Sequence, residues 1–197
     1  MDDPSGPHVA GIAGSLRDES YTRVSLGHAL DAAVDAGATT DLVDLRDLDL
    51  PLFDADRDQA GDADVLRDRV AAADAVVLAT PVYHGSYSSP LKTALDYCGF
   101  DEFEHKTVGL LAVGGGSFPV TALEHLRSVC RSLGAWVLPH QAAVPRARKS
   151  VDVTAGEVTD DDVADRIGTL GHRAVEYARI EPDPLPFEGE QNVGADD

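Results

Sequence analysis

Residues 75–96, AVVLATPVYHGSYSSPLKTALD, contain an apolar run, a polar loop and an amphipathic segment in direct succession. Residues 75–79 are wholly apolar, as expected of a central parallel strand that is covered on both faces. After the loop, apolar residues recur with helical spacing at Leu91, Ala94, Leu95 and Cys98. A strand, a loop and a helix in this order form the repeating unit of a parallel α/β sheet.

The same unit recurs along the rest of the chain. Short apolar runs predict further strands at residues 9–13, 42–45, 108–113 and 135–138. Apolar residues at helical spacing predict helices around residues 26–34, 66–73, 123–133 and 163–177. We therefore expect an α/β fold in which a five-stranded parallel sheet lies between two layers of helices. Strand order 2-1-3-4-5, a common arrangement of such sheets, is taken as the expected order.

Length and composition set the expected extent of the domain. The chain of 197 residues is long enough for one domain, which we expect to span residues 1–180. Residues 181–197 are proline-rich and acidic, which predicts a disordered tail. The first residues, MDDPSGPH, lack the regions of a secretory signal, and no apolar run reaches the length of a membrane helix. The expected location is the cytoplasm.

The formal net charge of -19 argues against two classes of partner. A strongly negative field repels nucleic acid and anionic membranes. The acidic residues are spread along the chain, which favours a solvated surface suited to a high-salt cytoplasm, as in a halophile, over a docking surface for a basic protein. Cys98 and Cys130 have no metal-binding spacing, so we expect two buried free thiols and no metal site.

Three loops of unusual composition follow the first, third and fourth predicted strands. In a sheet of this order they meet beyond the carboxyl ends of the strands. The first loop, residues 14–22, reads GSLRDESYT and leads into a helix, whose N-terminus favours a phosphate. Ser15, Ser20 and Thr22 add hydroxyl groups, and Arg17 adds a guanidinium that can hold two phosphate oxygens. Helix capping by Ser20 is the alternative, but capping needs only one such residue.

The other two loops suit a flat ring system. The second loop, residues 80–90, reads TPVYHGSYSSP; Tyr83 and Tyr87 offer aromatic faces, and Gly85 allows close approach of a ligand. His84 invites assignment as a general base, but no partner acid or nucleophile stands at a diagnostic spacing. The glycine loop, residues 114–117, reads GGGS, which is more glycine than a tight turn needs.

Motifs of several other α/β families are absent from the sequence. There is no GxxxxGK(S/T) phosphate loop, no GxGxxG after the first predicted strand and no GxSxG nucleophile turn. These absences argue against P-loop NTPases, dinucleotide-binding Rossmann domains and α/β-hydrolases.

In these motifs, residues 8–180 resemble the NADPH-dependent FMN reductase family of flavodoxin-like proteins. The family pattern is close to GSxRxxSxT after strand one and to PxYxGSxSxxLKxxLD after strand three. Residues 14–22 match the first pattern and residues 81–96 match the second, while residues 114–117 supply a glycine-rich turn. Pro90 departs from the small or apolar residue that the family more often has there, and the acidic loop 54–64 differs in character.

The resemblance implies a flavodoxin-like three-layer sandwich that binds FMN and uses NADPH or NADH as co-substrate. It implies phosphate contacts from Ser15, Arg17, Ser20 and Thr22. It implies ring contacts from Pro81, Val82, Tyr83, His84, Gly85 and Ser86, and from Gly114, Gly115, Gly116 and Ser117. It further implies a homodimer or homotetramer in which a neighbouring subunit helps to enclose the flavin.

The implied activity is hydride transfer from a nicotinamide cofactor to FMN, and then to a small-molecule acceptor such as a quinone, an azo compound or free flavin. The flavin carries this chemistry, so no side chain is assigned as a catalytic acid or base. A flavodoxin-like one-electron carrier and a flavin-free α/β binding protein are the alternatives. The acceptor stays open, as does the choice between NADH and NADPH, because no basic cluster for a 2′-phosphate is located.

Overall fold

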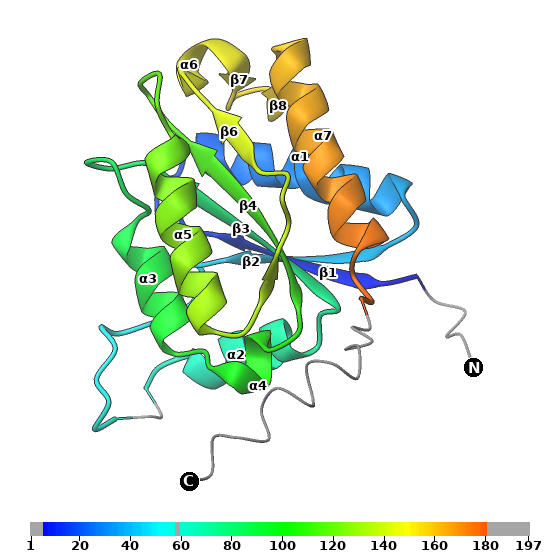
Figure 1. Cartoon of the computed structure of the whole chain (residues 1–197). Helices are drawn as coiled ribbons and strands as arrows, with labels where there is room; N and C mark the ends of the chain where they lie inside the picture. The colour runs from blue at the N-terminus through cyan, green and yellow to red at the C-terminus, as the bar shows by residue number, and fades with distance from the viewer. Residues whose placement is uncertain (1–5, 58–59, 181–197) are drawn as a thin grey trace, which may run out of the picture.

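Helices cover both faces of one parallel sheet in the computed structural model, which describes residues 6–57 and 60–180 (Figure 1). The body of the sheet consists of β1 (His8–Ala13), β2 (Thr39–Asp44), β3 (Ala75–Pro81) and β4 (Thr107–Val113). With β5 (Trp136–Val137), these strands pair in parallel in the order β2-β1-β3-β4-β5. The predicted strand order and the flavodoxin-like architecture are confirmed.

The fifth position of the sheet differs from the single strand expected at residues 135–138. Two short segments, β5 and β6 (Ala142–Val144), both pair with β4. Leu138 still donates its N–H to the Val108 carbonyl at 2.9 Å, and the pairing with β4 is then interrupted around Pro139 and His140. Pairing resumes with β6, beside the carboxyl end of β4.

Two apolar cores lie on opposite faces of the sheet. α1 (Tyr21–Asp35) and α7 (Asp161–Glu176) cover one face. The other face is covered by α2 (Ala63–Ala71), α3 (Ser89–Asp96), α4 (Phe100–Phe103) and α5 (Val120–Ser132) (Figure 1). Every residue of β3 is buried, as predicted for a central strand, because its alternate side chains enter the two cores.

The chain between β6 and α7 forms elements that the apolar pattern does not predict. A short helix, α6 (Ala147–Ser150), follows β6 directly. A small hairpin then pairs β7 (Val151–Asp152) with β8 (Glu157–Val158). These elements are too short to show a hydrophobic period, so sequence periodicity carries no signal for them.

Cys98 and Cys130 are both buried and both free, as predicted. Burial raises the pKa of each thiol to about 12. Both thiols therefore stay protonated near neutral pH, and neither is suited to act as a nucleophile. Within the described residues, no helix has the length and apolarity needed to cross a membrane. The tail predicted for residues 181–197 lies outside the described residues.

Candidate cofactor site

Four loops leave the same edge of the sheet because the carboxyl ends of their strands are in register. Ala13 of β1 pairs with Ala79 of β3, and Val113 of β4 pairs with both Pro81 of β3 and Val144 of β6. Three of these loops are the ones predicted to meet. The fourth follows β6 and runs into α6; residues 145–150 are called the α6 segment below.

Buried hydrogen bonds join the first loop to the second. The Ser88 hydroxyl donates to the Gly14 carbonyl at 2.6 Å, and the Ser88 N–H donates to the Thr80 hydroxyl at 2.9 Å. No side chain fits at residue 14, because a Cβ there would lie 2.9 Å from the Cβ of Leu91. The two loops are therefore held at a fixed separation.

A cavity of about 280 Å³ opens where the loops meet. All four segments contribute to its wall, which consists of Ser15, Arg17, Tyr21, Thr22, Pro81, Val82, Tyr83, Val113, Gly114, Gly115, Ala147 and Arg148. A second hollow, of about 240 Å³, shares part of this wall and is lined by Val82, Gly85, Gly114, Gly115, Gly116, Ser117, Phe118 and Pro119. The two hollows form one cleft along the glycine loop.

Three of the predicted site residues do not line this cleft. Ser20 caps α1, and its hydroxyl accepts the Arg23 N–H at 3.1 Å. His84 is exposed in a tight turn, where it and Gly85 have φ angles of 50° and 81°. Positive φ at both central residues is typical of a type I′ turn. Ser86 ends that turn, and its hydroxyl lies 3.0 Å from His125 Nδ1.

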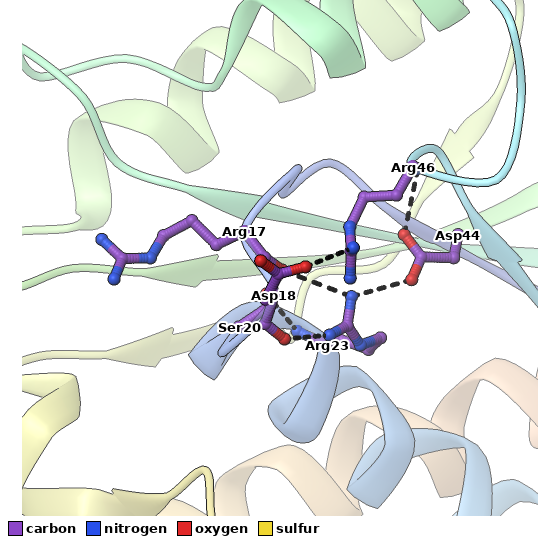
Figure 2. Close-up of polar contacts among 6 residues, drawn as sticks. All are labelled: Arg17, Asp18, Ser20, Arg23, Asp44 and Arg46. Atoms are coloured by element: carbon purple, nitrogen blue, oxygen red, sulfur yellow. Dashed lines mark hydrogen bonds and ion pairs between the residues drawn. The ribbon is translucent and has the colours of Figure 1, made fainter.

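Arg17 differs from the two arginines near it (Figure 2). Arg23 forms an ion pair with Asp44 at 2.8 Å, and Arg46 forms one with Asp18 at 2.5 Å. The Arg17 side chain points away from this network and lines the cavity. It makes no hydrogen bond or ion pair with any described residue, so its charge is available to an anion in the cavity.

Two hydroxyl groups in the same cavity also lack hydrogen-bond partners in the part of the chain that the structure describes. Ser15 and Thr22 line the cavity although they are only 3% and 2% exposed, and neither hydroxyl is hydrogen-bonded to a described residue. The first turn of α1 holds no acidic residue, so the positive end of the helix dipole is not offset there. This end of the cavity therefore suits a phosphate group.

The glycine loop offers bare backbone to the cleft. The Gly114 carbonyl accepts the Ala147 N–H at 3.0 Å, and the Gly116 carbonyl accepts the Arg146 N–H at 2.9 Å, so the loop is anchored. A Cβ at Gly115 or Gly116 would meet no atom within 4 Å, and neither residue has a positive φ. Neither packing nor backbone conformation requires glycine at these two positions, and clearance for a flat ligand does explain it.

The α6 segment is the part of the site that the sequence did not indicate. Ala147 and Arg148 line the cavity, and Arg146 donates a hydrogen bond to the Ser117 hydroxyl at 3.2 Å. A signal existed in the run PRARK at residues 145–149, which is strongly basic for a chain with a net charge of -19. The sequence alone located no basic cluster for a 2′-phosphate, and this run was not among its predicted site residues. Only the pairing of β6 with β4 brings this run to the site.

The fold defines a flavodoxin-like α/β protein with a cleft at the carboxyl ends of its strands. The family model described as NADPH-dependent FMN reductase matches residues 7–149, and the chain belongs to this family. An FMN-dependent NADPH-azoreductase from Staphylococcus aureus (strain USA300) is 46% identical over 78 residues, which are 40% of this chain and 42% of that protein. The match thus spans less than half of that relative.

Solved structures match over a larger part of the chain. An oxidoreductase from Corynebacterium diphtheriae superposes with a TM-score of 0.75 at 20% identity, over 88% of this chain and 97% of its own. The flavoenzyme FerB from Paracoccus denitrificans, an NAD(P)H:(acceptor) oxidoreductase, superposes with a TM-score of 0.71 at 23% identity, over 87% and 97%. At these identities the likeness supports the fold.

Proposed function

We propose that this protein is an FMN-dependent NAD(P)H oxidoreductase, which passes a hydride from a nicotinamide cofactor to FMN and from FMN to a small-molecule acceptor. One observation carries the proposal. A single cleft has an unpaired guanidinium at one end and a bare, anchored glycine loop along its wall. FMN has the matching parts, a phosphate and a flat ring system, and family membership supports the same cofactor.

The phosphate end would be held by groups that have no partner within the described protein. Arg17 offers a planar fork of donors, and Ser15 and Thr22 line the same cavity. The N-terminus of α1 adds N–H groups and a partial positive charge. Ser20 supports this end indirectly, because its cap fixes the start of the helix.

The ring would lie against the glycine loop, with Val82 in the wall that both hollows share. The N–H groups of Gly115 and Gly116 donate to no described carbonyl, so they are free to donate to ring oxygens and to stabilise negative charge there. Tyr83 is 52% exposed at the rim and offers an aromatic face. Bound FMN supplies the redox chemistry, while these residues orient it and exclude water.

An absorbance spectrum of the purified protein, before and after anaerobic addition of NADPH or NADH, tests this function. We expect visible flavin bands that bleach with at least one nicotinamide cofactor. Bands that bleach with dithionite alone would indicate the one-electron carrier instead. A protein that shows no bands, even after FMN is added, would contradict the proposal and favour a flavin-free binding protein. Quinones, azo compounds and free flavin are the acceptors to assay next.

Substitution of Arg17 by alanine tests the phosphate end. We expect FMN affinity, measured by fluorescence titration, to fall about tenfold or more, because a charge-assisted hydrogen bond to the phosphate is lost. The thermal stability of the apoprotein should not change, since the Arg17 side chain forms no hydrogen bond or ion pair with a described residue. Hydride transfer to flavin that is already bound should slow less than binding weakens. An unchanged FMN affinity would remove Arg17 from the site.

In the same proposal the protein is a homodimer or homotetramer in the cytoplasm. Phe118 lines the second hollow and is 85% exposed, which leaves a large apolar side chain at the cleft for a second copy to cover. Two free thiols suit a reducing compartment. Sedimentation velocity in high salt should show a dimer or tetramer, and a Phe118→Asp variant should shift it toward monomer. A wild-type monomer would contradict this part of the proposal.

A further inference from the structure

The cations of this acidic protein are unevenly distributed. Most basic side chains bind a carboxylate or a backbone carbonyl; Arg69 binds Asp41, for example, and Arg166 binds the Ala143 carbonyl. Within residues 6–57 and 60–180, the basic side chains with neither kind of partner are Arg17, Arg131, Arg146, Arg148, Lys149 and Arg173. Arg131 and Arg173 lie on α5 and α7, whereas the other four belong to the first loop and the α6 segment.

The two arginines of the α6 segment lie at different parts of the cleft. Arg148 lines the first cavity together with Arg17 of the first loop. Arg146 donates to the hydroxyl of Ser117, which lines the second hollow. Both residues are exposed, so their side chains are accessible to a ligand in solution.

The backbone at Arg146 gives an independent reason to assign its side chain a function. Its φ of 50° and ψ of 45° lie in the left-handed region, which disfavours any residue with a Cβ. The local structure needs this conformation, because the Arg146 N–H donates to the Gly116 carbonyl. It does not need an arginine, since glycine adopts this conformation without strain. An arginine in this strained conformation indicates that its side chain has a functional role.

We propose that Arg146 and Arg148 form a second phosphate site, which binds the 2′-phosphate of NADPH and gives the enzyme a preference for NADPH over NADH. The proposal rests on the proposed function. Arg17, Ser15, Thr22 and the helix N-terminus already serve the FMN phosphate, so these two arginines remain for another anion. The 2′-phosphate is the group that distinguishes the two reductants, and arginine is suited to hold it. In so acidic a protein, a dianion needs such a local cluster.

Binding to the FMN-loaded protein tests the site without turnover. Calorimetric titration with adenosine 2′,5′-bisphosphate and with adenosine 5′-monophosphate compares ligands with and without the 2′-phosphate. We expect the wild type to bind the bisphosphate about tenfold more tightly or better. Arg146→Gly and Arg148→Ala should each lose most of this preference, and the ratio of KM values for NADH and NADPH should fall in parallel.

Two further measurements separate the loss of a phosphate site from an effect on FMN binding or on folding. FMN affinity is measured for both variants by fluorescence titration, and a 2′-phosphate site requires the adenosine-ligand preference to fall by a larger factor than FMN affinity does. Arg146→Gly should be at least as stable as the wild type, because it relieves the left-handed strain. As a control for overall charge, Arg131→Ala removes the same charge from α5, away from the cleft, and should keep the full preference.

Several results would overturn the inference. A wild type that binds both adenosine ligands equally has no 2′-phosphate site. A loss of FMN affinity in Arg148→Ala with an unchanged adenosine preference would assign the arginine to the flavin phosphate. If Arg131→Ala loses the preference for the bisphosphate to the same extent, the preference arises from overall charge and not from a phosphate site. Failure to bind FMN would instead contradict the proposed function, and the same titration without FMN would still decide the phosphate preference.

Discussion

Replacement of Gly115 by leucine is expected to weaken FMN binding by about a hundredfold while leaving the apoprotein folded and as stable as the wild type. A Cβ at this position meets no protein atom within 4 Å, and the backbone has no positive φ, so the new side chain causes no strain. It enters the cleft instead, because Gly115 lines both hollows. Fluorescence titration with FMN and thermal denaturation of the apoprotein measure the two effects.

Gly27→Leu is the matched control for this variant. Gly27 also has open space around its Cβ position, but it lies within α1, away from the cleft. A leucine there should raise stability by about 0.5–1 kcal/mol, because glycine is a poor residue for a helix interior, and should leave FMN affinity unchanged. If Gly115→Leu binds FMN as the wild type does, the ring does not lie on the glycine loop.

A large loss of stability is expected for Gly171→Ala. Gly171 lies in α7 where this helix crosses α1, and a Cβ there would stand 2.0 Å from the Ala29 carbonyl oxygen. The clash is with backbone, so the two helices must move apart, which we expect to cost about 3 kcal/mol of unfolding free energy. FMN affinity should fall as well, because α1 carries the first loop at its N-terminus.

Gly168→Ala, in the same helix, supplies the comparison. Its Cβ would have its nearest neighbours at 4.0 Å, which is an ordinary contact. This variant should gain about 0.5–1 kcal/mol from the helix propensity of alanine. Urea denaturation of both variants measures the difference in unfolding free energy. Equal stabilities would show that the close approach of α7 to α1 does not constrain the fold.

The parts of the site that could be predicted are those that depend on local pattern and on one rule of topology. An apolar run such as residues 75–79 identifies a central strand, and parallel strands place the loops that follow them at one edge. From this alone the first, second and glycine loops could be brought together. The structure places Arg17, Tyr83 and Gly115, among others, in the wall of one cavity.

Local pattern could not assign individual side chains within those loops. Ser20 suits a phosphate contact and a helix cap equally well in sequence, and the structure shows it as the cap. Arg17, Arg23 and Arg46 are equally charged in sequence. They differ in the structure because Asp44, on β2, neutralises Arg23, and Asp18 neutralises Arg46. Such pairs join residues that are distant along the chain, so no local window contains them.

The sequence by itself therefore determined the α/β class, the two buried thiols and the three loops of the cleft, because the hydrophobic period and the turn residues that follow each strand are local features. The strand order, which depends on long-range pairing, was an expectation that the structure confirmed. Only the tertiary structure decided which arginine stays unpaired and that the α6 segment completes the site. The reason is that the fifth position of the sheet is divided between β5 and β6, and this long-range pairing of β6 with β4 leaves no local pattern in the sequence. That pairing carries Arg146 and Arg148 to a cleft whose other walls lie far earlier in the chain.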